Sequence, residues 1–282
     1  MPSSGGDEEN VADDAVMSPP PWLPLLAELT RLSPSWAVWK NADRAIAISG
    51  DIDSVSPPGD RDVLLHAFMR WASGNGMAPI FICHHLPGSV LGVALRGRRE
   101  LVELQLCERA VFRGSTLFTA RDLRPFMVID DRGFRRLRPG AEGLLLLFHN
   151  AMQRGGRPAL ATKKARRSLE LMRLDPEGVH AATAVFGSAQ EHARLVAEAA
   201  LDDQWDRASA VRVEAWAVTR GVLEPALLAS RAVYRASGGR YCALLPFLRR
   251  GRVVHGDVDA WLVRAARTHR SGQLSATPIG ND

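Results

Sequence analysis

Two aspartates separated by one apolar residue are the side chains in this sequence best suited to chemistry. Asp51 and Asp53 lie at positions 49–55, which read SGDIDSV. In a strand, residues two apart face the same side, so both carboxylates would point to one place while Ile52 points into a core. Neighbouring carboxylates repel each other unless a cation lies between them, and Mg²⁺ prefers such oxygen ligands. The pattern indicates metal-assisted phosphoryl chemistry.

The same spelling recurs near the C-terminus, where Asp257 and Asp259 precede an apolar pattern of helical spacing at 261–263. There Asp257 suits a helix N-cap and Asp259 suits the first helical turn. The D-x-D pattern alone therefore does not identify a functional site. Whether Asp51 and Asp53 form one depends on the strands and helices around them.

Two other strands must bring further polar residues to these aspartates. A short strand at 36–39 ends at Lys40-Asn41, about ten residues upstream. A hairpin pairs 89–95 with 100–106, and its second arm alternates between apolar residues and a face that carries Glu103 and Gln105. The sequence thus predicts a mixed sheet in which a carboxylate lies on a strand near the two aspartates.

This order of a strand with a polar turn, a D-x-D strand and a later strand with a third acid resembles the nucleotidyltransferase superfamily that includes DNA polymerase beta-like enzymes. The resemblance covers roughly residues 22–150 and is nearest to small bacterial nucleotidyltransferase-like proteins. It implies that Asp51 and Asp53 hold Mg²⁺ against a triphosphate. Glu103 would complete the metal site or deprotonate the acceptor hydroxyl. If Gln105 takes the third-acid position instead, a weak or inactive enzyme follows.

The first motif of that family is usually an apolar residue followed by Gly-Gly or Gly-Ser, which holds the nucleotide phosphates. Lys40 and Asn41 stand at this place, so the tight glycine turn is absent. Lys40 can still neutralise phosphate as a cation. Ser49 and Gly50, directly before the acids, offer another close backbone approach. All four residues are therefore expected to bind the nucleotide.

A basic region follows the predicted sheet. Between residues 131 and 173 there are eleven Lys or Arg residues and three acids. Such a region can hold a triphosphate, steer an RNA backbone, or simply be a solvated surface. The resemblance places Arg136 and Arg138 where the helical part closes over the nucleotide, so they are expected to bind phosphate, while Glu142 is expected to pair with one of the arginines.

The fold class we predict is α+β, with a nucleotidyltransferase-like mixed β-sheet and helices followed by a helical C-terminal domain. The periodicity changes near residue 130. We expect a disordered tail at 1–21, the α/β domain at 22–130, the helical domain at 131–270 and a frayed tail at 271–282. Helices are expected at 22–32, 60–73, 139–152, 160–174, 176–186, 189–200, 205–217, 224–236 and 258–268.

The composition favours a cytoplasmic protein with an acidic partner and no membrane span. The chain has 282 residues, 46% of them hydrophobic, and a formal net charge of +5. Its acidic N-terminus does not resemble a signal peptide, and its three cysteines show no pairing or metal-ligand spacing. Cys83 suits a core position, and His84 and His85 would point in opposite directions on a strand.

The preferred hypothesis is a Mg²⁺-dependent enzyme that transfers a nucleoside monophosphate from an NTP to a hydroxyl of a small molecule or RNA, releasing pyrophosphate. An alternative is an inactive relative that binds nucleotide or an anionic partner through the arginine-rich junction. A third hypothesis is an RNA-directed toxin of the same fold, whose substrate would be an RNA terminus.

Overall fold

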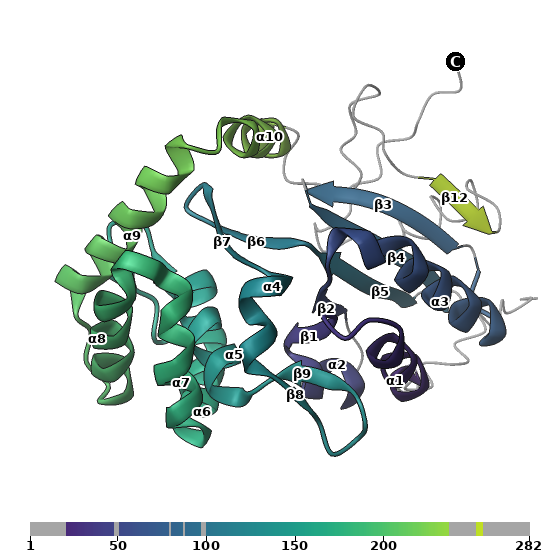
Figure 1. Ribbon diagram of the computed structural model, residues 1–282, viewed down its shortest axis with the longest axis horizontal. Coiled ribbons are helices and arrows are strands. Elements are labelled where there is room, and N and C mark those ends of the chain that lie inside the picture. Colours follow the sequence, from purple (N-terminus) through teal and green to yellow (C-terminus); the bar gives the residue numbers. More distant parts are fainter. Residues whose placement is uncertain are drawn as a thin grey trace, which may run out of the picture.

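The protein is built around one mixed β-sheet. The computed structural model describes residues 21–47, 51–78, 80–86, 88–96, 100–236 and 252–255 (Figure 1). The sheet has eight strands in the spatial order β12-β3-β4-β5-β2-β1-β9-β8. Their bounds are β1 Ala37–Lys40, β2 Ile52–Val55, β3 Ile80–Leu86, β4 Ser89–Arg96, β5 Glu100–Cys107, β8 Met127–Ile129, β9 Arg135–Leu137 and β12 Arg252–His255.

Strand β2 lies in the interior of this sheet. It runs parallel to β5 and antiparallel to β1, while β1 runs parallel to β9. The predicted hairpin is confirmed as β4 and β5, which pair antiparallel along their whole length. Residues of β2 therefore have neighbours on both sides, and the sheet itself fixes their direction.

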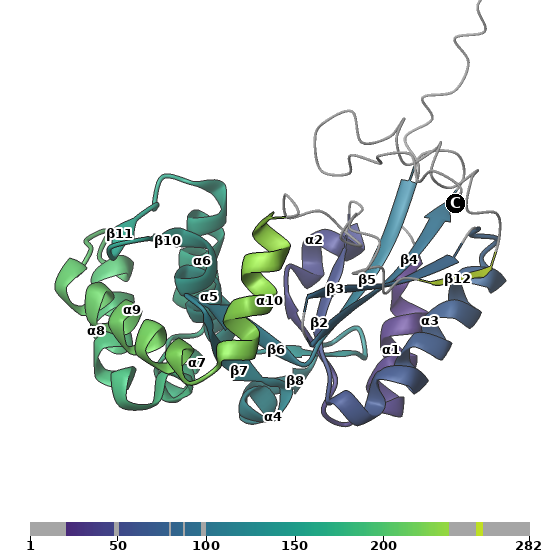
Figure 2. The ribbon, with the colours of Figure 1, turned by 90° about the horizontal axis from the view of Figure 1, so that it is seen from above.

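Helices α1 (Trp22–Leu32) and α3 (Arg61–Gly74) cover one face of the sheet (Figure 2). Ile52 and Leu104 are fully buried in the core beneath them. Gly92 on β4 is required by the close approach of Phe68, because a Cβ there would lie 2.6 Å from the Phe68 ring. Burial of apolar side chains drives this packing and leaves the opposite face for the remaining residues of β2 and β5.

Asp60 has the residue type and the position of an N-cap for α3, from which a capping hydrogen bond is expected. Asp60 does precede the helix, but its side chain makes no capping hydrogen bond. Its carboxylate accepts a hydrogen bond from the Ser33 hydroxyl at 2.5 Å instead. Ser33, which follows α1, thus binds the Asp60 carboxylate that would otherwise cap α3.

The remaining helices pack around α5. Every residue of α5 from Gly140 to Leu146 is buried, and α6 comes so close that a Cβ on Gly143 would lie 2.7 Å from the Ser168 carbonyl oxygen. The predicted buried helix at 139–152 is confirmed, with a π-helical last turn at Leu147–Ala151. The bounds are α2 Ala42–Ala47, α4 Ala120–Leu123, α5 Pro139–Leu146, α6 Lys163–Leu174, α7 Pro176–Ala182, α8 Gln190–Leu201, α9 Arg207–Val222 and α10 Pro225–Ala236.

Short elements complete the chain. Two separate two-stranded sheets pair β6 with β7 and β10 with β11. Their bounds, with those of the 3₁₀ turns, are β6 Arg109–Phe112, β7 Ser115–Thr119, β10 Met152–Gln153, β11 Arg157–Pro158, η1 Pro58–Asp60, η2 Arg124–Phe126 and η4 Thr183–Ala189.

The sheet extends beyond the boundary expected at residue 130. Strand β9 pairs with β1 and strand β12 pairs with β3, so the sheet takes two strands from the region expected to be helical. The mixed α+β class is confirmed. The expected helix at 258–268, the C-terminal Asp257 and Asp259, and nearly all of both expected tails lie outside the described residues. Within the described ranges, no helix combines the length and apolar character that crossing a bilayer requires.

Candidate active site

Asp53 lies on the sheet face opposite the α1–α3 core. Its register partners are Lys40 on antiparallel β1 and Gln105 on parallel β5. Paired residues of adjacent strands share a face. The Lys40 Nζ lies 3.1 Å from Asp53 Oδ1, and the two side chains are 19% and 16% exposed. The carboxylate is thus largely buried and held by one ammonium group.

Asp51 directly precedes β2, and strand alternation places it on the same side as Asp53. It keeps an exposed surface, but the protein around its carboxylate removes part of its hydration. This desolvation and the charge of Asp53 raise the pKa of Asp51 to about 6, while Lys40 opposes the rise. Burial also raises the pKa of Asp53, against the ammonium groups of Lys40 and Lys164. The two aspartates are therefore short of positive charge.

Glu103 and Gln105 both lie on this acidic face, as the alternation of β5 predicts. Gln105 is the direct neighbour of Asp53, and its Nε2 donates to the Ser89 hydroxyl at 3.0 Å. Glu103 is 6% exposed and precedes Gln105 by two residues. Continuing the β2–β5 register by one residue sets Glu103 beside Asp51. Each aspartate therefore has one of the two candidates as its neighbour on β5.

The acidic face offers two metal ligands. Among the residues that the structure describes, no three His, Cys, Asp or Glu side chains come together as a group that could hold a metal ion. Asp51 and Asp53 provide hard oxygen atoms whose mutual repulsion a divalent cation would relieve. Mg²⁺ commonly takes one or two carboxylates and completes its shell with water and phosphate oxygens. Asp51 and Asp53 fit such an ion, and a role of Glu103 as a third ligand stays a prediction.

Asn41 makes the turn for which a glycine is expected. Its φ is +58°, in the left-handed region that Asn tolerates better than most residues. Its backbone N–H donates to Glu142 Oε1 at 2.8 Å. Helix α2 begins at the next residue, between β1 and β2. The turn after Lys40 is thus fixed by a buried carboxylate of α5. Ser49 and Gly50 lie outside the described residues.

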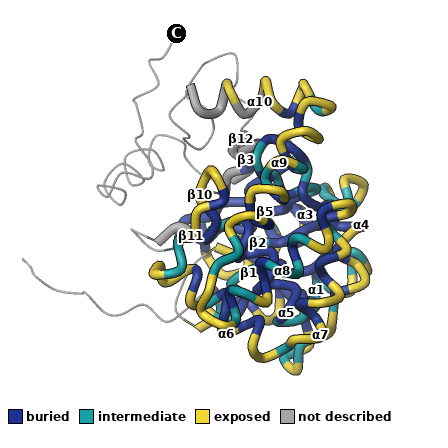
Figure 3. The backbone as a smooth tube through the Cα atoms, turned by 90° about the vertical axis from the view of Figure 1, so that its left-hand side faces the viewer, coloured by how far each residue is buried: buried dark blue, intermediate teal, exposed yellow. Residues whose placement is uncertain are grey.

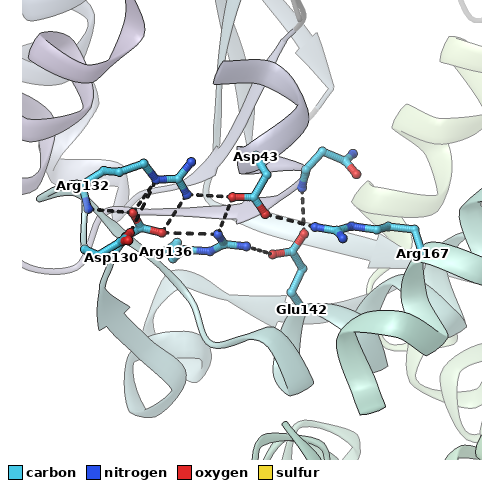
Figure 4. Close-up of polar contacts among 8 residues, drawn as sticks. Asp43, Asp130, Arg132, Arg136, Glu142 and Arg167 are labelled. Atoms are coloured by element: carbon cyan, nitrogen blue, oxygen red, sulfur yellow. Dashed lines mark hydrogen bonds and ion pairs between the residues drawn. The ribbon is translucent and has the colours of Figure 1, made fainter. Parts of the chain in front are cut away.

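An ionic network joins α2 to later parts of the chain. Asp43 accepts hydrogen bonds from Arg132 at 2.7 Å, Arg136 at 2.9 Å and Arg167 at 3.0 Å. Figure 4 shows the three guanidinium groups around this carboxylate. Burial favours the neutral acid, but the hydrogen bonds from Arg132 and Arg136 lower the pKa of Asp43. The network fixes α2, which follows Lys40 in the chain.

Arg136 also confirms the expected pairing of Glu142 with an arginine. Its Nη2 donates to Glu142 Oε2 at 3.0 Å, and the two side chains are 9% and 1% exposed. Burial raises the pKa of Glu142, while Arg136 and the Asn41 N–H oppose this shift. A buried charge of this kind is tolerated because it is paired and hydrogen-bonded.

Arg138 is also bound to a carboxylate. Its Nε and Nη2 donate to Asp175 at 2.8 and 2.5 Å. Asp175 further accepts the backbone N–H groups of Gly140 at 2.9 Å and Gly178 at 3.0 Å. Both predicted phosphate ligands, Arg136 and Arg138, therefore already hold carboxylates. A phosphate would have to compete for them, and their role stays a prediction.

Lys164 is the functional candidate that sequence reasoning did not single out. It lies in the first turn of α6, which contains Lys163, Lys164 and Arg166 and no acid. Its charge acts on Asp53, far away in sequence. Cations are unfavourable at a helix N-terminus, so a bound anion would relieve this turn. The signal in the sequence was the basic cluster, but only the fold brings it to β2.

Other polar groups lie apart from this face. Cys83, His84 and His85 belong to β3, which β4 and β5 separate from β2. A pocket of about 420 Å³ lies between the β6–β7 turn and helices α9 and α10. It is lined by Arg113, Gly114, Arg154, Glu214, Val218, Leu228 and Ala232. Neither of the two aspartates lines this pocket.

Comparisons with protein-family models, with curated proteins and with solved structures find no match to this chain.

Proposed function

We propose that this protein binds an NTP together with Mg²⁺ at the acidic face and transfers a nucleoside monophosphate to a hydroxyl acceptor, releasing pyrophosphate. The observation that carries the proposal is the position of Asp53, beside Asp51 and under the influence of Lys40 and Lys164. Two acids that need a cation thus lie next to cations that suit an anion. A metal–triphosphate complex supplies both charges. A cytoplasmic location would provide both ligands.

In this proposal the carboxylates bind the metal ion, and the lysines interact with Asp53 and the triphosphate. Asp51 and Asp53 would hold the ion, which when bound neutralises charge on the phosphate oxygens during an in-line displacement. Lys40 orients Asp53 through their ion pair. Lys164, whose charge acts on Asp53, would bind the negative charge of the triphosphate. Position and electrostatics, which dominate phosphoryl transfer, are thus supplied by side chains of β1, β2 and α6.

The reaction joins the acceptor oxygen to the α-phosphorus and breaks the bond from that phosphorus to the bridging oxygen of the leaving pyrophosphate. The acceptor hydroxyl loses its proton. Glu103, buried on the same face, is the proposed base for that proton. The register sets Glu103 beside Asp51, where a buried carboxylate suits proton transfer from an acceptor held at this face.

A second candidate is a relative that binds nucleotide without turnover. Two observations favour it. Lys40 already neutralises Asp53 at 3.1 Å, and no third acid completes a metal site within the described ranges. Such a protein would bind nucleotide through its cations without requiring a metal.

Pyrophosphate release tests the proposal. The protein is incubated with the four NTPs, Mg²⁺ and either mixed RNA or small hydroxyl compounds, and wild type is compared with Asp51→Asn and Asp53→Asn. Each variant is expected to lose on the order of 100-fold in rate. Asp131→Asn is the matched control, because that side chain is 93% exposed. Wild-type rates in both active-site variants would overturn the proposal.

A further inference from the structure

The cations of the helical part fall into two groups. Several of its arginines are paired with carboxylates, as in Arg136 with Glu142 and Arg138 with Asp175. Five cations close together in sequence have no ion-pair partner among the described residues, and all five are exposed. We call them the basic strip: Arg154, Arg157, Lys163, Lys164 and Arg166.

The basic strip has no acid next to it in sequence, and Glu214 of α9, which contacts the hairpin, is already paired with Arg113. The sequence contains no Asp or Glu between Glu142 and Glu170. Figure 2 shows the β10–β11 hairpin and α6 on the same side of the molecule, and Figure 3 shows exposed residues there. An uncompensated surface of one sign attracts partners of the opposite sign. The strip is therefore suited to an extended anion.

The hairpin that carries two of these cations is held firmly. The Trp205 Nε1 donates to the Gly156 carbonyl oxygen at 2.7 Å, and the Gly156 N–H donates to Glu214 at 2.9 Å. The Ala159 N–H donates to the Ala151 carbonyl oxygen at 2.8 Å. These bonds tie the turn to α9 and to the end of the π-helical turn. Arg154 and Arg157 thus extend from a fixed platform.

The strip leads to the acidic face. Lys164 acts electrostatically on Asp53, and Arg167, one residue beyond the strip, contacts Asp43 of α2 at 3.0 Å. The basic strip thus reaches the two aspartates at the start of α6, while Arg154 and Arg157 lie on the hairpin that precedes this helix in the chain. A small acceptor would need one or two of them. A chain with regularly repeated negative charge would use them all.

We propose that the acceptor is a single-stranded polynucleotide, whose backbone phosphates lie along the basic strip while its terminal hydroxyl reaches the Asp51–Asp53 face. The inference that the polynucleotide binds depends only on the basic strip. The inference that its hydroxyl is the acceptor rests on the proposed function. A single strand suits this route, because one terminal hydroxyl must reach the two aspartates while the backbone phosphates contact the cations at the start of α6.

Salt-dependent binding tests the strip. A fluorescein-labelled 20-nucleotide RNA and the DNA of the same sequence are titrated between 50 and 200 mM NaCl, with anisotropy as the readout. The test variant is Arg157→Glu/Lys163→Glu/Arg166→Glu. The control is Arg31→Glu/Arg121→Glu/Arg124→Glu, three exposed arginines without a described partner on α1, α4 and η2. Figure 2 shows α4 on the opposite side from the strip.

The strip variant is expected to lose affinity on the order of tenfold or more, and its slope of log K against log salt should fall by about 2, since each contact contributes about 0.7. The control should match wild type. Tighter binding of RNA than of DNA would identify the 2′-hydroxyl as a contact, and equal binding would assign recognition to phosphate; both outcomes support the strip. Equal affinity of strip variant and control would overturn it.

Turnover separates this inference from the proposed function. If the wild type binds RNA through the basic strip but releases no pyrophosphate, the proposed function is overturned. The inference that the basic strip binds a polynucleotide is then retained. If pyrophosphate release with a small hydroxyl acceptor is the same in wild type and strip variant, and RNA is not bound, the polynucleotide acceptor is overturned and the enzyme stands. Thermal melting of each variant identifies those that fail to fold.

Discussion

The backbone N–H of Asn41 donates to the buried carboxylate of Glu142, 101 residues later, at 2.8 Å. This bond joins the turn after β1 to helix α5. Asn41 has a left-handed backbone conformation at the position where the nucleotidyltransferase resemblance predicts a glycine. The turn that follows Lys40 is therefore made tight by a different residue and fixed by a distant acid.

The first prediction concerns the left-handed conformation of Asn41. Gly adopts a φ of +58° freely, whereas a β-branched residue does not. Asn41→Gly should change the free energy of unfolding by less than about 1 kcal/mol, and Asn41→Val should lower it by about 2 kcal/mol. Urea unfolding measures both. Equal stability of the two variants would show that the turn is not constrained.

The second prediction concerns the charge of Glu142. Glu142→Gln keeps an acceptor for the Asn41 N–H but removes one of the carboxylates that balance the buried Arg136, leaving Asp43 and Asp130. The free energy of unfolding should fall by about 2 kcal/mol. Asp131→Asn makes the same chemical change at an exposed ion pair and should change it by less than about 0.5 kcal/mol. Similar values for the two variants in urea unfolding would contradict the network.

Only part of this network could be predicted from the sequence. The buried helix at 139–152, the alternation of β5 and the pairing of Glu142 with an arginine follow from apolar period and the cost of burying charge. The Asn41–Glu142 bond does not, because nothing local to either residue specifies a partner 101 positions away. The same holds for Lys164 and Asp53, whose proximity depends on how α6 packs.

Local cues also failed at α2 and Asp60. Ala42–Ala47 has few residues and a weak period, so no state was predicted for it, yet Asp43 is fixed there by three arginines. Asp60 has the residue type and position of an N-cap, but the Ser33 hydroxyl takes its carboxylate. Tertiary contacts outweigh local propensity in both cases.

The third prediction is a pH dependence from Asp175. Although burial acts in the opposite direction, hydrogen bonds from Arg138, Gly140 and Gly178 lower the pKa of Asp175 in the folded state. A lowered folded pKa means that the stabilisation is complete above the unfolded value near 4 and disappears as pH falls through the folded pKa. The stability difference between wild type and Asp175→Asn should therefore shrink from pH 5 to pH 2. Thermal melting across this range measures it, and a difference that grows on acidification would refute the assignment.

The fourth prediction is energetic coupling between Lys40 and Asp53. Lys40→Met leaves a largely buried carboxylate without its cation, whereas the double variant with Asp53→Asn removes both charges. A double-mutant cycle in urea should give a coupling energy of about 1–3 kcal/mol. Mg²⁺ should restore part of the stability lost in Lys40→Met, since it replaces the missing charge. Additive effects of the two substitutions would mean that the ion pair contributes nothing.

Metal-dependent nucleotide binding tests the central claim most directly. A non-hydrolysable ATP analogue is titrated calorimetrically into wild type, Asp53→Asn, Lys164→Glu and the Asp131→Asn control, with Mg²⁺ or with EDTA. We predict that Mg²⁺ strengthens binding to wild type and the control by on the order of tenfold or more, and that Asp53→Asn loses this gain while Lys164→Glu weakens binding. Equal affinity of wild type in Mg²⁺ and EDTA, unchanged in Asp53→Asn, would contradict a metal–nucleotide site at this face.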